Sequence, residues 1–276
     1  MPEVIDFHIH ILQKEQYNPP SLDFVRRLNP ETFEERMAII AHPASLKAHL
    51  QKEGVHYGVI LAENAPVTTG MVPNEFVAQF CRGEEMLIPF ASINPNNEAD
   101  PAARLVYCVE ELGMRGLKLL PPYGLYYPND VSIYPVYAEA QRLRIPVLIH
   151  TGSSTFRGSR MKYGDPLYLD DVAVDFPRLT IVMAHSGRGP FYERAFFLAR
   201  HHSNIYMEIS GLPPQRLLDY FPEFERNADK TIFGSDWPAI PQGIGDNIRD
   251  FCALPLKSST MEKVLYRNAE RILFGG

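Results

Sequence analysis

Val4-Ile5-Asp6-Phe7-His8-Ile9-His10 is typical of a buried β-strand that ends in polar side chains. Successive side chains of a strand point to opposite faces, so this alternation predicts that Asp6, His8 and His10 share one face. Two imidazoles two positions apart at the end of a strand can both reach one cation. The segment therefore predicts a first strand that carries part of a metal site at its carboxyl end.

Seven further apolar, β-branched runs follow, with enough chain between them for one helix and two loops. They are Tyr57–Ala62, Leu87–Ser92, Arg115–Leu120, Pro146–His150, Thr180–Ala184, Ile205–Ile209 and Thr231–Gly234. Helix signals lie between the runs; for example, Asp100 and Pro101 form an N-cap and a first-turn proline, and Gly113 ends that helix. This alternation predicts an α/β fold, a closed (β/α)8 TIM barrel. An open doubly wound sheet would usually carry a glycine-rich phosphate loop after its first strand, and the sequence has none there.

The chain has 276 residues, of which 45% are hydrophobic and 22% charged, and its formal net charge is −6. This composition excludes intrinsic disorder and suits one domain over residues 1–276. The acidic balance argues against nucleic-acid binding, and no apolar run is long enough for a membrane span. Cys81, Cys108 and Cys252 form no disulfide or zinc pattern, and the N-terminus does not resemble a secretion signal. We therefore expect a cytoplasmic protein.

Residues 12–54 are too long for a simple connection between a strand and the next helix. They contain Asn18-Pro19-Pro20 and at least one predicted helix, over residues 44–53. In a barrel this segment would lie over the mouth. We therefore treat it as an insertion after strand one and as a candidate lid.

Polar residues recur where the predicted strands end. His150 ends the fifth run, His185 follows the sixth, Asp236 follows the eighth, and Lys118 lies in the fourth. Barrels build their active sites at the carboxyl ends of their strands. Buried imidazoles and a carboxylate at one mouth would leave polar groups unpaired unless a cation or substrate satisfied them. The pattern therefore predicts a metal site.

Four motifs and the C-terminal segment resemble the amidohydrolase superfamily. The matching stretches are Asp6-Phe7-His8-Ile9-His10, Ile149-His150-Thr151-Gly152, Ala184-His185-Ser186-Gly187, Phe233-Gly234-Ser235-Asp236-Trp237-Pro238 and Asn268-Ala269-Glu270-Arg271-Ile272-Leu273. More narrowly, they are similar to the "amidohydrolase 2" branch, which holds metal-dependent hydrolases and the aminocarboxymuconate-semialdehyde and resorcylate decarboxylases. The resemblance extends from Val4 to about Phe274.

The resemblance implies that His8, His10, His150 and Asp236 bind a divalent metal. It also implies that His185 completes a second metal position or acts as the general acid/base. Zinc fits ligation by nitrogen and carboxylate, and manganese, iron and nickel are alternatives. One or two ions per chain are compatible with these residues.

Lys118 has three interpretations. In two-metal members of the superfamily, a carboxylated lysine on strand four bridges the metals, and Lys118 resembles that residue. A buried lysine beside cations would have a lowered pKa, which makes the free amine needed for carboxylation accessible. Alternatively, Lys118 remains an amine that binds substrate, or it forms a structural ion pair.

The loops after the fourth to sixth strands predict a site for an acidic substrate. Tyr123 belongs to a stiff aromatic rim, and Arg157, Arg160 and Arg188 form a basic group in an acidic protein. Arginine binds carboxylates through two parallel hydrogen bonds. Trp237, directly after Asp236, either forms a wall of the pocket or packs beneath it. We expect His201 and His202, at the end of a predicted helix over 190–202, to interact with the helix dipole and not to act as metal ligands.

Our first functional hypothesis is a metal-dependent hydrolase that cleaves an amide, ester or lactone bond of a small, carboxylate-bearing substrate with metal-activated water. Asp236 would take the proton from that water, and His185 would help to stabilise the oxyanion. The alternative is a carboxy-lyase that decarboxylates an aromatic or unsaturated acid, with His185 or Asp236 protonating the ring carbon. A third hypothesis is a non-catalytic barrel that binds a small molecule. The expected partner is a small-molecule substrate, and a homodimer suits barrels of this kind.

Overall fold

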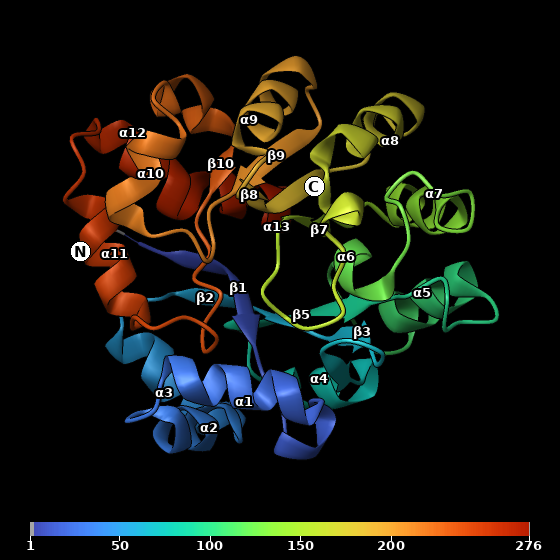
Figure 1. The fold of residues 1–276 in the computed structure, drawn as a ribbon, viewed down its shortest axis with the longest axis horizontal. Coiled ribbons are helices and arrows are strands. Elements are labelled where there is room, and N and C mark those ends of the chain that lie inside the picture. Colours follow the sequence, from blue (N-terminus) through green and yellow to red (C-terminus); the bar gives the residue numbers. More distant parts are fainter. Residues whose placement is uncertain (1–2, 276) are drawn as a thin grey trace.

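The computed structural model describes residues 3–275 and is built around eight parallel strands (Figure 1). They are β1 (Ile5–His10), β2 (Tyr57–Leu61), β5 (Leu87–Ser92), β6 (Leu117–Leu119), β7 (Val147–Gly152), β8 (Ile181–Arg188), β9 (Ile205–Glu208) and β10 (Thr231–Ile232). Their order in the sheet is their order along the chain. Each strand overlaps one predicted run, and the prediction of a (β/α)8 TIM barrel is confirmed.

The barrel closes through the chain that follows β10. The amide N of Phe7 donates to the carbonyl O of Phe233 at 3.1 Å, and the amide N of Asp236 donates to the carbonyl O of His8 at 3.0 Å. Because these bonds join β1 to the residues after β10, the two ends of the sheet meet. The closure brings Asp236 next to His8, although the two residues are far apart in sequence.

Helices pack around this barrel, on its outside and at its mouth. They are α1 (Pro19–Leu28), α2 (Phe33–Ile40), α3 (Pro43–Lys52), α4 (Asn74–Cys81), α5 (Pro101–Glu110), α6 (Pro121–Gly124), α7 (Tyr134–Leu143), α8 (Leu169–Asp175), α9 (Tyr192–His201), α10 (Leu217–Tyr220), α11 (Ile244–Cys252), α12 (Ser258–Glu262) and α13 (Asn268–Phe274). The expected N-cap is present, since the Asp100 side chain accepts a hydrogen bond from the amide of Ala103 at 2.9 Å. Residues 214–230 form no continuous helix and contain α10 with 3-10 turns on both sides. Within residues 3–275, no helix combines the length and the apolar character needed to cross a bilayer.

The first strand departs from strict alternation. The pairing of β1 with β2 shifts between Asp6 and Ile9, where three steps along β1 match two along β2. A bulge of this kind moves later side chains to the other face. Phe7 accordingly packs in the inner barrel cluster, whereas Ile9 packs in the larger cluster that includes the helices. His8 and His10 line the same cavity and Asp6 does not, so the expected sharing of one face by all three residues is wrong.

Residues 12–54 contain a 3-10 turn at Lys14–Gln16 and the helices α1, α2 and α3, which gather on one side of the barrel (blue in Figure 1). Arg36 of α2 fixes this segment to the loop that follows Asp236. Its guanidinium donates to the carbonyls of Pro238 at 3.1 Å and Pro241 at 2.9 Å, and also to that of Ile240. Since Arg36 is only 8% exposed, these carbonyls replace the water that its charge would otherwise bind.

An antiparallel hairpin, formed by β3 (Glu63–Ala65) and β4 (Gly70–Val72), was not expected from the sequence. Its first strand begins two residues after β2 ends, where the apolar run gives way to polar side chains. Through Glu63 the hairpin contributes a buried carboxylate to the mouth of the barrel.

Candidate metal centre

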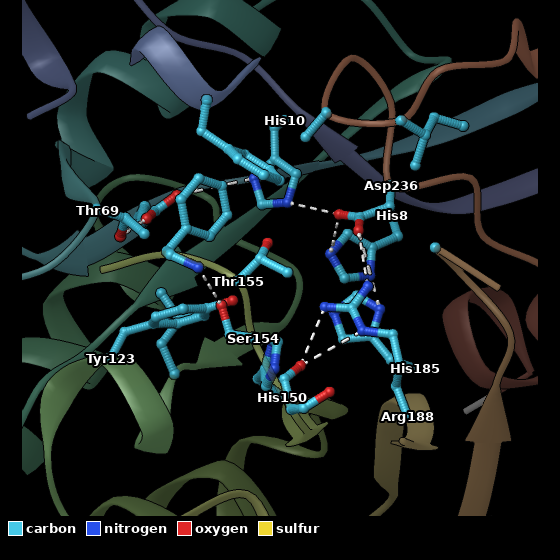
Figure 2. Close-up of a pocket in the computed structure, with 18 of the residues that line it drawn as sticks. His8, His10, Thr69, Tyr123, His150, Ser154, Thr155, His185, Arg188 and Asp236 are labelled. Atoms are coloured by element: carbon cyan, nitrogen blue, oxygen red, sulfur yellow. Dashed lines mark hydrogen bonds and ion pairs between the residues drawn. The ribbon is translucent and has the colours of Figure 1, made fainter. Parts of the chain in front are cut away.

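One cavity of about 270 Å³ opens at the carboxyl ends of the strands. Its lining includes His8, His10, Tyr17, Phe24, Glu63, Lys118, Tyr123, His150, Phe156, His185, Arg188, Gly211, Asp236 and Ile240. Figure 2 shows the imidazoles of His8, His10 and His185 gathered around Asp236, with Tyr123 on the opposite side. Every metal-binding residue expected from the sequence therefore lines this cavity.

Asp236 lies at the centre of the imidazole group. Its Oδ1 is 3.2 Å from Nε2 of His10 and 3.5 Å from Nε2 of His8, and its Oδ2 is 4.0 Å from Nδ1 of His185. One donor atom from each of His8, His185 and Asp236 lies within 4.8 Å of the others. Both His185 and Asp236 have left-handed backbone conformations, with φ of 63° and 71°. Such conformations cost energy and are concentrated at functional sites.

Glu208 and Ser210 determine which nitrogen of two imidazoles faces the cavity. Nδ1 of His8 is 2.9 Å from Oγ of Ser210 and 3.3 Å from Oε2 of Glu208. Nδ1 of His185 is 2.9 Å from the carbonyl O of Ser210, which can only accept. Both rings therefore carry their proton on Nδ1, and Nε2 keeps its lone pair for a ligand.

His10 has a similar partner on its other side. Oε2 of Glu63 lies 3.8 Å from Nδ1 of His10 and accepts a hydrogen bond from the Tyr17 hydroxyl at 3.0 Å. Glu63 also accepts from the Thr69 hydroxyl. A carboxylate behind a metal-binding imidazole orients the ring and strengthens its donor nitrogen.

Three of the four imidazoles are held in the form that binds metals. Burial, followed by the charge of Lys118, holds the pKa of His8 well below its ordinary value. Burial, followed by the charge of Arg188, does the same to the pKa of His150 and of His185. These rings are neutral at pH 7, and a metal ion binds only the neutral ring.

His150 provides the test of whether a cation fits. Its Nε2 is buried and has no hydrogen-bond partner among the residues that the structure describes. A buried polar atom without a partner is costly. Its ring packs edge to face with that of Tyr123, at a centroid distance of 4.8 Å, and lies 4.6 Å from the ring of His185. An unpaired nitrogen in a group of neutral imidazoles with one carboxylate fits a divalent cation.

Lys118 is 1% exposed, and its Nζ lies 3.2 Å from Nε2 of His8. Burial lowers the pKa of Lys118, although the charges of Glu208 and Asp236 partly oppose the change. The lone pair on His8 Nε2 can accept a proton from Lys118 or bind a cation, but not both. Metal binding therefore requires the amine to move or to be modified.

Arg188 is the arginine that enters the cavity. Its Nη1 is 3.7 Å from Oδ2 of Asp236, and its Nη2 donates to the carbonyl of Ser153 at 3.2 Å. Gly211 makes room for this pair. A Cβ at Gly211 would lie 2.6 Å from Nη1 of Arg188 and 2.7 Å from Oδ2 of Asp236, and its φ of +62° also favours glycine.

Three residues expected to bind substrate lie outside the cavity lining. Arg157 and Arg160 are exposed on the loop that follows β7, just beyond Ser153–Phe156, which do line the cavity. Trp237 is 2% exposed and stacks on His49 of α3 at a centroid distance of 4.8 Å, so it packs beneath the loop. By contrast, Tyr123 is buried in the cavity wall.

Sequence reasoning missed Glu208, Ser210 and Glu63. Glu208 is an acidic residue within the apolar run over residues 205–209, and this is the signal that could have identified it. The structure shows that it is fully buried. Glu63 follows β2 closely, as His150 and Asp236 follow their strands. Burial is the main cause of the raised pKa of Glu208, and the hydrogen bond from Ser210 opposes it.

Comparison with known proteins identifies one relative by sequence and several solved structures with a similar fold. γ-Resorcylate decarboxylase of Rhodococcus jostii (strain RHA1) is 26% identical over 219 residues, which cover 60% of this chain and 64% of that protein. The match thus spans less than two thirds of that relative. An uncharacterised TIM-barrel protein from Bordetella bronchiseptica superimposes with a TM-score of 0.80 at 26% identity, over 98% of each chain.

A dihydroxybenzoic acid decarboxylase from Polaromonas sp. JS666, solved with bound manganese and the inhibitor 2-nitroresorcinol, has the same fold. Its TM-score is 0.73 at 15% identity, over 99% of this chain and 97% of that one. A sequence model of the Amidohydrolase family, in its Amidohydro_2 branch, matches residues 5–275. The motifs, the barrel and this match agree, and the chain belongs to the amidohydrolase family.

Proposed function

We propose that this chain is a metal-dependent carboxy-lyase that removes the carboxyl group of a small hydroxylated aromatic acid. The observation that carries the proposal is a single cavity that combines an imidazole–carboxylate group, Arg188 and aromatic walls. The names of two relatives, a γ-resorcylate and a dihydroxybenzoic acid decarboxylase, support this reaction. They favour decarboxylation, the alternative hypothesis from the sequence, over hydrolysis, the first one.

The walls of the cavity suit a planar ring. Phe24, Tyr123 and Phe156 line it, and the rings of Phe24 and Phe156 pack edge to face at 5.1 Å. Arg188 would bind an anionic oxygen of the substrate, because a guanidinium forms strong, directed hydrogen bonds to such oxygens. The aromatic ring and its acidic groups would thus be held on different sides of one pocket.

His8, His10, His150 and Asp236 would hold the divalent cation. When bound, it supplies positive charge that stabilises negative charge on the substrate oxygens. Nitrogen donors with one carboxylate suit both zinc and manganese, and the Polaromonas decarboxylase contains manganese. Mn²⁺ and Zn²⁺ are therefore the two ions to test.

His185 is the proposed proton carrier. Its Nδ1–H is bonded to the carbonyl of Ser210, so Nε2 can accept the proton of a ring hydroxyl. When the bond between the ring and the carboxyl carbon breaks, its electron pair stays on the ring carbon, and carbon dioxide leaves. His185 returns the proton to that carbon. Asp236 would bind the cation together with the imidazoles of His8, His10 and His150, and would take no part in the proton transfer.

The test is an assay of the purified chain, loaded with Mn²⁺ or Zn²⁺, against hydroxylated benzoates that include 2,6-dihydroxybenzoate. We expect release of one carbon dioxide per substrate consumed. Asp236→Asn should lose turnover while its circular dichroism spectrum stays unchanged. Hydrolysis of amides, esters or lactones without decarboxylation would contradict the proposal, and so would ligand binding without turnover across the whole panel.

Lys118 favours hydrolysis as a second candidate function. Its buried amine, beside Nε2 of His8, is placed where a carboxylated lysine could bind two metal ions. Metal analysis of protein prepared with bicarbonate distinguishes the two candidates. A loss of two ions per chain in Lys118→Met, relative to the wild type, would support a two-metal hydrolase, whereas an unchanged metal content in that variant would support the carboxy-lyase.

A further inference from the structure

A second group of metal-binding side chains lies on the outside of the barrel. Asp170 belongs to α8, His201 is the last residue of α9, and His202 follows it. One donor atom from each lies within 4.8 Å of the other two. None of the three lines the cavity at the mouth.

The end of α9 makes this convergence feasible. Consecutive residues within a helix point about 100° apart around its axis, so neighbours do not normally face one point. His202 has left the helix, with φ of −101° and ψ of 134°. The rings of His201 and His202 lie 4.7 Å apart at an angle of 84°. The change of backbone direction thus brings two adjacent imidazoles to the same side.

Asp170 and His202 already form a preorganised pair. Nε2 of His202 is 2.6 Å from Oδ1 of Asp170, and the side chains are 11% and 45% exposed, respectively. His201 is exposed and lies against Phe197, with ring centroids 5.4 Å apart. The fold therefore holds Asp170 and His202 in position, and the exposed ring of His201 can rotate to complete the group.

We propose that Asp170, His201 and His202 bind a divalent transition-metal ion, for which zinc is the best match. Two imidazoles and one carboxylate are a frequent zinc donor set, and water would complete the four positions. The ion would take the place of the proton on His202 Nε2 and separate that nitrogen from Asp170 Oδ1. It would bind α8 to the end of α9, the helices that follow β7 and β8.

The proposal is tested by counting the zinc ions that metal-stripped protein binds at a free Zn²⁺ concentration set by a chelating buffer. His201→Gln and Asp170→Asn change exposed side chains, so both variants should fold normally. We expect each to bind one zinc ion fewer per chain than the wild type. His42→Gln, which changes an exposed histidine elsewhere, should bind as many as the wild type.

The Asp236→Asn background shows whether the zinc ion lost from His201→Gln comes from this site or from the cavity at the mouth. In that background, a further His201→Gln change should still remove one zinc ion per chain. The proposal is overturned if His201→Gln and Asp170→Asn bind as much zinc as the wild type. It is also overturned if the His201→Gln change removes no zinc in the Asp236→Asn background. Thermal melts verify that each variant is folded.

Discussion

Glu208, at the end of β9, lies beneath His8 of β1, with its Oε2 3.3 Å from Nδ1 of the ring. Glu208 also accepts hydrogen bonds from the amide of His185 at 3.2 Å and from the Ser210 hydroxyl at 2.7 Å. One buried carboxylate therefore positions two of the imidazoles at the mouth.

Glu208→Gln tests this positioning role. The amide keeps the size of the side chain but places an N–H group where an acceptor is needed. We expect the affinity for Mn²⁺ to fall by about 10–100-fold, the usual effect of changing a group behind a metal ligand. Titration calorimetry on metal-stripped protein measures this. Glu34→Gln, at an exposed site, is the control, and equal affinities in the two variants would disprove the role.

His185→Asn should separate proton transfer from metal binding. If His185 carries the proton and the other imidazoles hold the ion, turnover of the substrate found should fall by at least about 100-fold. The Mn²⁺ content should stay close to that of the wild type. Asp236→Asn, in comparison, should lose both properties. Loss of the metal from His185→Asn would make His185 a ligand instead of a proton carrier.

Arg188→Gln should weaken the binding of an acidic substrate. Because Arg188 is the arginine that lines the cavity, we expect KM for a hydroxybenzoate to rise about tenfold or more. Arg157→Gln and Arg160→Gln are matched controls, since both side chains are exposed outside the cavity. Steady-state kinetics of the three variants check this. A rise in KM for the two controls would show that their guanidinium groups also reach the substrate.

Asp6→Asn should change how stability depends on pH. Burial raises the pKa of Asp6 from 3.8 to about 7. Between these values the folded protein holds a proton that the unfolded chain has lost, so stability decreases as the pH rises through this range. In metal-stripped protein, urea unfolding should show a wild-type loss from pH 5 to pH 7 that exceeds that of Asp6→Asn by roughly 2 kcal/mol. Identical pH dependence would show that Asp6 is ionised in the folded state.

Arg36→Met should release the loop after Asp236 from α2. The change removes the donors to the carbonyls of Pro238, Ile240 and Pro241, which would then lack partners. We expect a loss of about 3 kcal/mol in the free energy of unfolding, with faster proteolysis of residues 238–242. Arg27→Met, at an exposed position of α1, is the control. Wild-type stability in Arg36→Met would mean that the loop holds its own shape.

Polar residues at the ends of the predicted strands identified most of the candidate site, because a barrel brings the ends of its strands together. His8, His10, Lys118, His150, His185, Asp236 and Arg188 were all expected there, and all line one cavity. Loops follow no such periodicity, and Arg157 and Arg160 therefore could not be placed. The bulge in β1 and the supporting role of Glu208 depend on pairing between distant strands. No single stretch of sequence shows such pairing.

The bulge in β1 has a consequence for how this protein can change over evolution. Strict alternation would send either Phe7 or the pair His8 and His10 away from the barrel interior, so one additional residue between Asp6 and Ile9 lets both face inward. Deleting any residue there would shift the register and redirect the side chains that follow. Point substitutions in the walls can alter which ligand the cavity accepts. Insertions and deletions in this short stretch should be eliminated by selection.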